Sequence, residues 1–99
     1  MNIYNVVKEI IKDSIRSRFK VQDDLLLNRI SSEPPKNIKF GDLSTNVAMI
    51  LSKPLRQRPN ILAKEVSEII LKSELIAKVD IVNPGFINIF LKREVWNKV

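Results

Sequence analysis

The chain has 99 residues, a length that suits one domain with its own hydrophobic core. Its 17 Lys and Arg residues exceed its 11 Asp and Glu residues, and the resulting net charge of +6 favours an anionic partner. The absence of histidine and cysteine excludes Ser-His and Cys-His nucleophiles, zinc sites built on these ligands, and disulfides. Gly41 and Gly85 lie far apart, so the chain has no glycine-rich phosphate loop. We therefore expect no catalytic residue, no metal site and no cofactor bound by this chain.

The N-terminal residues lack a basic segment followed by an apolar run, so we expect no signal peptide. No stretch approaches the roughly 18 consecutive apolar residues of a membrane-spanning helix, so we expect no membrane partner. The lack of cysteine fits a reducing compartment, and we expect a cytoplasmic protein.

Residues 2–19 place apolar side chains along one face at helical spacing, which predicts an amphipathic helix. Residues 20–28 are ambiguous, because Leu25–Leu27 fits either a helical turn or the start of a strand. The adjacent carboxylates of Asp23 and Asp24 are interpreted as solvated loop residues. Residues 29–33 fit a short strand, which the two prolines that follow would end or confine to a sheet edge.

A second helix is predicted to start within Phe40–Asn46, with Gly41 in the turn and Asp42 as its N-cap. Both residues are thus interpreted as structural. Pro54 is expected to stop this helix. Pro59 fits the first turn of a third helix, where its missing N–H costs nothing. The buried face of that third helix is predicted to consist of Leu62, Val66, Ile69 and Ile70.

The hydrophobic period changes towards two after Ile76, where Val79 and Ile81 alternate with Lys78 and Asp80, and this predicts a half-buried strand. A type II turn is predicted next, with Pro84 at its second position and Gly85 supplying a positive φ. Tight hairpins prefer the mirror-image turns, so a wider loop or a bulged hairpin stays open.

The strand predicted at 86–91 has Phe86, Asn88 and Phe90 on one face and three aliphatic residues on the other. If that asparagine were buried, its amide would need several hydrogen-bond partners. If it were exposed, the pair of ring and amide would suit an unstacked nucleobase, with the ring stacking and the amide reading an edge. Phe90 lies deeper in the strand and is expected to pack in the core. Residues 92–99 resemble the first turns of another helix.

This order of elements predicts an α+β fold, in which helices pack on one face of a small antiparallel sheet. The other face of the sheet is a natural site for a partner. Residues 1–99 are expected to form a single domain.

Two segments resemble motifs of one protein family. Phe40–Met49 resembles the glycine–aspartate motif at which a helix starts in the N-terminal domains of arginyl-tRNA synthetases, and Asn83–Ile89 is similar to the Pro-Gly-Phe-Ile-Asn strand of the same domains. Their separation, and the helix start at Pro59–Ala63 between them, also match. The resemblance covers essentially the whole chain, with residues 20–38 the poorest match. Arg58 departs from the pattern, because many members have an Asn or Ser helix cap there.

The resemblance implies a domain that contacts the outer corner of tRNA(Arg), where the D-loop meets the TΨC loop, and helps to select arginine tRNAs. Many of these tRNAs carry a distinctive D-loop adenosine. Carried over from the family, Asn83 and Asn88 would bond exposed D-loop bases, and Phe86 would stack on one. Pro84 and Gly85 would shape the turn that presents them. Some members carry Tyr at the ring position, so any hydrogen bond made by its hydroxyl would be missing here.

The resemblance also implies a longer parent enzyme, of which these residues are an N-terminal fragment without the catalytic and anticodon-binding domains. The parent would be a class I arginine–tRNA ligase that uses ATP with magnesium and arginine, and the rest of its chain would be a partner of this domain. Its His-Ile-Gly-His-like motif requires histidine, so this chain is not expected to be active alone.

Four basic residues are candidate phosphate contacts, which would add affinity that falls with salt but little sequence choice: Lys53, Arg56, Lys78 and Lys92. Two other functions stay open. The helices expected at Leu43–Leu51 and Pro59–Leu71 would suit a helix–turn–helix module that binds DNA, although their connection lacks the usual glycine. The second alternative is a docking domain without a nucleic-acid partner.

Overall fold

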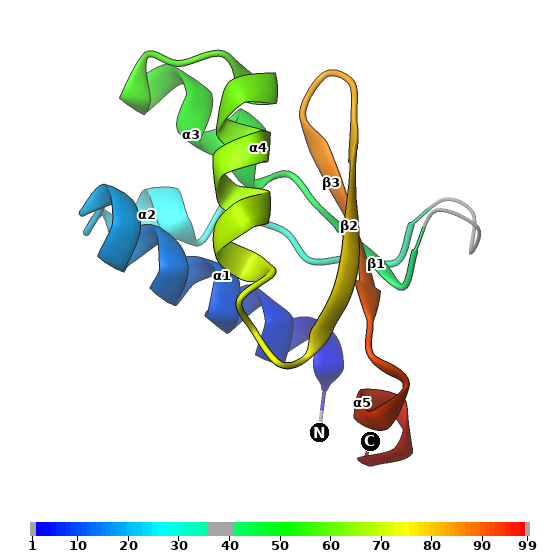
Figure 1. Cartoon of the computed structure of the whole chain (residues 1–99). Helices are drawn as coiled ribbons and strands as arrows, with labels where there is room; N and C mark the ends of the chain where they lie inside the picture. The colour runs from blue at the N-terminus through cyan, green and yellow to red at the C-terminus, as the bar shows by residue number, and fades with distance from the viewer. Residues whose placement is uncertain (1, 36–40, 99) are drawn as a thin grey trace.

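The structure is a computed structural model that describes residues 2–35 and 41–98, and the side chains of residues 2–35 and 41–95. Five helices and three strands follow one another along these residues (Figure 1): α1 (Ile3–Phe19), α2 (Asp24–Leu27), β1 (Leu43–Thr45), α3 (Val47–Leu55), α4 (Pro59–Ile70), β2 (Ile76–Val82), β3 (Phe86–Leu91) and α5 (Arg93–Lys98). The strands form one antiparallel sheet in the order β1-β3-β2. Helices α1, α3 and α4 lie on one side of this sheet, which confirms the predicted α+β class.

The hydrophobic core lies between the sheet and these three helices. Helix α1 contributes residues spaced four apart, and α4 and β3 face them with their own apolar sides. Each fully buried aliphatic side chain stabilises the fold by roughly 1.5–3 kcal/mol relative to an exposed one. The largest fully buried side chains include Ile11, Ile15, Leu62, Ile70, Ile87 and Ile89.

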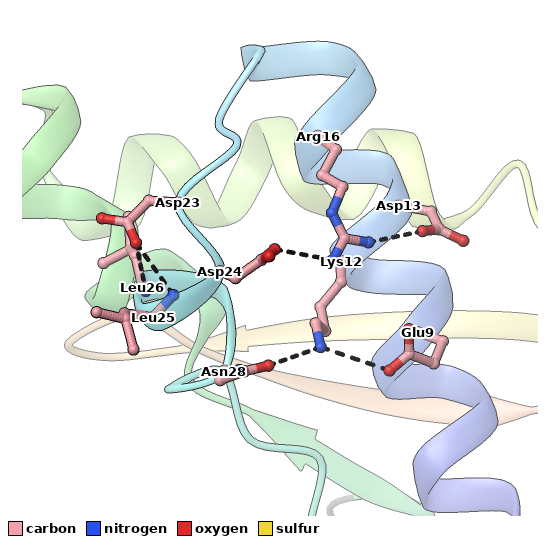
Figure 2. Close-up of polar contacts among 9 residues, drawn as sticks. All are labelled: Glu9, Lys12, Asp13, Arg16, Asp23, Asp24, Leu25, Leu26 and Asn28. Atoms are coloured by element: carbon pink, nitrogen blue, oxygen red, sulfur yellow. Dashed lines mark hydrogen bonds and ion pairs between the residues drawn. The ribbon is translucent and has the colours of Figure 1, made fainter.

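One charged residue, Lys12, is buried on α1, with only 8% of its surface exposed. Its Nζ donates to Oδ1 of Asn28 at 2.9 Å and lies 3.5 Å from Oε1 of Glu9 (Figure 2). One turn further along, Arg16 lies 3.6 Å from a carboxylate oxygen of Asp24 (Figure 2). These contacts attach the segment after α1 to the helix itself, while the aliphatic stem of the lysine covers apolar surface.

The ambiguous segment at 20–28 contains a helical turn, α2, and not a strand. Oδ1 of Asp23 caps this turn by accepting from the backbone N–H groups of Leu25 at 3.0 Å and Leu26 at 3.3 Å (Figure 2). Asp23 is exposed and lies outside α2, as interpreted, and its capping role was not predicted; Asp24 is the first residue of α2 and not a loop residue. Leu27 turns into the core and is fully buried.

The helix predicted to start at Asp42 starts later, because Leu43–Thr45 is strand β1 and α3 begins at Val47. Asp42 is therefore not a helix cap. Its Oδ2 accepts from the backbone N–H of Leu91 at 2.7 Å, and its own N–H donates to the carbonyl of Ile89 at 2.8 Å. Pairing with β3 satisfies the backbone here, and this pairing outweighs the local capping signal. The first helix of the helix–turn–helix alternative is shortened accordingly.

Gly41 is structural, as predicted, and its geometry gives two reasons. Its φ is +119°, in the region that favours glycine. A Cβ at this position would lie only 2.9 Å from the carbonyl oxygen of Ile89. The chain can therefore pass close to β3 only without a side chain at residue 41.

Two prolines carried predictions about α3 and α4, of which the first is wrong and the second is confirmed. Pro54 does not stop α3, which includes it and ends at Leu55, where Arg56 adopts a left-handed conformation with φ +53°. Pro59 stands at the start of α4, as predicted. Among the described residues, no helix is both long enough and apolar enough to cross a membrane.

The hairpin between β2 and β3 does not contain the predicted type II turn, because Gly85 does not have a positive φ. Residues 83–85 connect Val82 and Phe86, which pair across the two strands, and the Asn83–Pro84 peptide bond is cis. The wider loop that the sequence left open is thus the one observed.

Gly85 has a packing role in place of the conformational one. It is buried, and a Cβ there would lie 2.7 Å from Cβ of Pro59 and 3.3 Å from Cγ of Met49. The absence of a side chain lets the hairpin tip rest on the first turn of α4. This contact fixes the position of the residues at the tip.

Candidate nucleic-acid interface

The side of the sheet that faces away from α1, α3 and α4 carries a regular pattern of side chains, and we call it the open face. Directly opposed residues of antiparallel strands point to the same face. The observed register therefore places three rows on the open face: Ser44–Asn88–Asp80, Lys78–Phe90 and Val82–Phe86. The predicted alternation along β3 is confirmed, since Ile87, Ile89 and Leu91 on the other face are buried in the core.

A cleft of about 410 Å³ lies on this face, within the size range of small-ligand sites. One wall comes from the β2–β3 hairpin and consists of Val82, Asn83, Phe86 and Asn88. The other wall comes from the chain before β1 and consists of Ser31, Glu33, Pro34 and Pro35, with Ser44 of β1 between the two walls.

The three residues predicted to contact RNA bases line this one cleft. The ring of Phe86 is accessible, because the residue is 39% exposed beside Val82, which is 44% exposed. Asn83 is exposed at the hairpin tip, whereas Asn88 is only 8% exposed and lies at the centre of the sheet. The arrangement combines an accessible aromatic ring with two amides that can both donate and accept hydrogen bonds.

The second wall of the cleft was not predicted as part of the site. Glu33 pairs with Ser44 as an isolated bridge, with N···O distances of 3.0 and 2.7 Å. The amide of Asn46 holds the same segment, accepting from the N–H of Ser31 at 2.7 Å and donating to the carbonyl of Arg29 at 3.3 Å. The sequence signal for this wall is the short strand expected at 29–33, but its partner Ser44 was assigned to a helix.

None of the four candidate phosphate contacts lines the cleft. Lys78 does lie on the open face, where its Nζ is 4.9 Å from the centre of the Phe90 ring and 3.7 Å from Oδ2 of Asp80. Phe90 therefore lies beneath a lysine on the open face, and the expectation that it packs in the core is wrong. Lys92 follows β3 and is exposed.

Lys53 and Arg56 are exposed at the end of α3, within the helical layer. The structure thus brings one of the four basic residues to the open face and leaves these two on the other side of the sheet (Figure 1). The described residues contain no group of three or more acidic side chains placed to hold a metal ion.

Comparison with known proteins identifies the family to which the chain belongs. The model of the family described as "Arginyl tRNA synthetase N terminal domain" matches residues 5–91. The chain belongs to this family. The match includes both walls of the cleft and every strand of the sheet.

Curated relatives of this arginyl-tRNA synthetase N-terminal domain are much longer than the domain itself. It is 39% identical over 101 residues to the arginine–tRNA ligase of Brucella ovis, covering 99% of this chain and 17% of that protein. It is 38% identical over 91 residues to the arginine–tRNA ligase of Malacoplasma penetrans, covering 90% of this chain and 16% of that protein. The chain thus spans about a sixth of the length of these relatives.

Solved structures share the fold of the domain. Thermus thermophilus arginyl-tRNA synthetase superposes with a TM-score of 0.75 at 20% identity, over 98% of this chain and 15% of that one. The Plasmodium falciparum arginyl-tRNA synthetase gives a TM-score of 0.69 at 23% identity, over 97% of this chain and 17% of that one.

Proposed function

We propose that this domain binds the D-loop corner of tRNA(Arg) and helps to select that tRNA for arginylation. The observation that supports the proposal best is the convergence of Asn83, Phe86 and Asn88 on one cleft of the open face. These are the positions that the family resemblance connects with base contacts. Strand alternation alone puts Phe86 and Asn88 on one face, and the fold adds the facing segment 31–35, which completes the cleft around them.

The chemistry of the cleft suits an unstacked base. An exposed ring such as that of Phe86 gains about 1–3 kcal/mol per stacked base. An asparagine amide can bond two positions on a base edge at once, as it does with adenine. The net charge of +6 adds attraction to phosphates that weakens with salt and carries no sequence information.

We also propose that the domain works as part of an arginine–tRNA ligase in the cytoplasm. The catalytic and anticodon-binding domains would lie elsewhere in that enzyme, which would bind ATP with magnesium and arginine, and they would be partners of this domain. The names and lengths of the relatives support this proposal. The histidine-free chain would contribute tRNA selection and no catalytic group.

The test is the affinity of the chain for a tRNA(Arg) transcript, measured by fluorescence anisotropy at fixed salt. Phe86→Ala should weaken binding by about tenfold or more, because a stacked base loses its platform. Leu25→Ala is the matched control, since Leu25 is an exposed apolar residue of α2 at 83% exposure and lies outside the cleft. Equal affinities of the Phe86→Ala variant and the unmodified chain would refute the proposal.

A further inference from the structure

We propose that Glu33 is a specificity-determining residue of the cleft, whose carboxylate accepts a hydrogen bond from the exocyclic amine of the bound base. The inference rests on the proposed RNA-binding function and deepens it. It adds a residue from the second wall and favours bases that carry an exocyclic amine, namely adenine, cytosine and guanine.

The register of the sheet aligns Glu33 with the predicted base-reading residue. Glu33 pairs with Ser44, and Ser44 pairs with Asn88, so the three residues form one transverse row on the open face. Neighbouring strands lie about 4.8 Å apart, which separates the backbones of Glu33 and Asn88 by about 10 Å. The short serine between them leaves room above it. A base edge placed there meets an amide on one side and a carboxylate on the other.

The apolar residues of the cleft lie beside this row on both walls. Pro34 and Pro35 follow Glu33 directly, and Phe86 and Val82 stand on the hairpin wall. Apolar groups on both walls of the cleft favour binding of a planar ring between them. Asn88 is only 8% exposed and lines the cleft, so it adds a polar group beside these apolar residues.

The charge of Glu33 decides which ring edge fits. An ionised carboxylate only accepts hydrogen bonds, so it bonds an amino group and repels a phosphate; uracil offers it only the single N3–H, which is flanked by two carbonyls that the carboxylate repels. Asp80 lies on the far side of Asn88 in the same row, but its carboxylate is 3.7 Å from Lys78. The salt bridges between described side chains do not include Glu33. Its carboxylate is therefore the acidic group that a ligand in the cleft meets.

The test compares two tRNA(Arg) molecules that differ by one amine. One carries adenosine at the distinctive D-loop position, and the other carries purine riboside, which lacks the exocyclic amine. The unmodified chain should bind the adenosine form about tenfold more tightly, the value expected of one hydrogen bond to a charged group. Glu33→Ala should reduce this preference to less than about twofold, while its affinity for the purine riboside form stays equal or rises because a negative charge is lost.

Two further variants separate this role from a general effect of charge. Glu33→Gln keeps the shape and an acceptor oxygen, and should give an intermediate preference. Glu68→Ala removes the same charge from an exposed position on α4, and should leave the preference unchanged. The pairing of Glu33 with Ser44 uses backbone atoms only, so all these variants retain it.

The outcomes distinguish this inference from the function on which it rests. A Glu33→Ala chain that keeps the tenfold preference overturns the role of Glu33. The same holds if the unmodified chain binds both tRNAs equally while Phe86→Ala weakens both. If the unmodified chain binds neither tRNA, the proposed function fails and this inference fails with it.

Discussion

Gly85→Ala tests how the hairpin that carries the proposed base contacts is fixed to the helices. The added methyl group would lie 2.7 Å from Cβ of Pro59, closer than two non-bonded carbon atoms approach in folded proteins. It would also lie 3.3 Å from Cγ of Met49, a flexible side chain that can move aside. The proline ring is rigid and starts α4, so the hairpin tip or the helix must shift.

The expected cost is that of overpacking. Inserting one methyl group into a well-packed site costs about 1–3 kcal/mol. Backbone conformation adds nothing, because the φ of Gly85 is not in the left-handed region. For a chain of this length, each kcal/mol lowers Tm by about 4–8 °C. Urea unfolding monitored by circular dichroism measures the free energy, and a thermal scan measures the shift in Tm.

A double-mutant cycle isolates the contact itself. Pro59→Gly removes the atom that the new methyl group meets, so Gly85→Ala should cost about 1 kcal/mol less in that background than in the unmodified chain. An equal cost in both backgrounds would show that the contact with Pro59 is not the cause. A Gly85→Ala chain as stable as the original would refute the close packing of the tip.

Four other substitutions test the fold. Gly41→Ala should lower the free energy of unfolding by about 1–3 kcal/mol in urea, because a φ of +119° strains alanine. Asp42→Ala should cost about 1–3 kcal/mol and speed hydrogen exchange at the Leu91 amide, its partner at 2.7 Å; unchanged exchange there would contradict the bond. Lys12→Met should change the free energy of unfolding by less than about 1 kcal/mol. Asn28→Ala should lower it by about 1–3 kcal/mol, because the buried ammonium of Lys12 loses its acceptor; the reverse order would contradict this contact.

The sequence predicts those parts of the fold whose signal is local and long. Helix α1 has an apolar residue on one face in every turn, and α4 starts at a proline and continues with the same spacing, so both were predicted. The alternation along β3 was equally clear. It placed Phe86 and Asn88 on one face before any tertiary contact was known.

Errors arise where a distant partner decides the conformation. Asp42 has the local context of a helix cap, but its carboxylate binds the amide of Leu91, which lies 49 residues away in the chain. The pairing of Glu33 with Ser44 is also tertiary, so the second wall of the cleft was missed. Lys12 shows the same limit, because composition predicts an exposed lysine and only the fold provides Asn28 as its acceptor.

The most direct test of base recognition is an amide-shift titration by NMR of this chain with a tRNA(Arg) transcript at low and moderate salt. A D-loop variant of the transcript serves as the control. Base recognition by the cleft predicts amide shifts centred on residues 83–88 and on the facing residues 31–33, which precede two prolines without an amide N–H, and smaller shifts with the D-loop variant. Shifts confined to lysines and arginines, lost at moderate salt and equal for both transcripts, would reduce the interface to a basic surface and contradict base recognition.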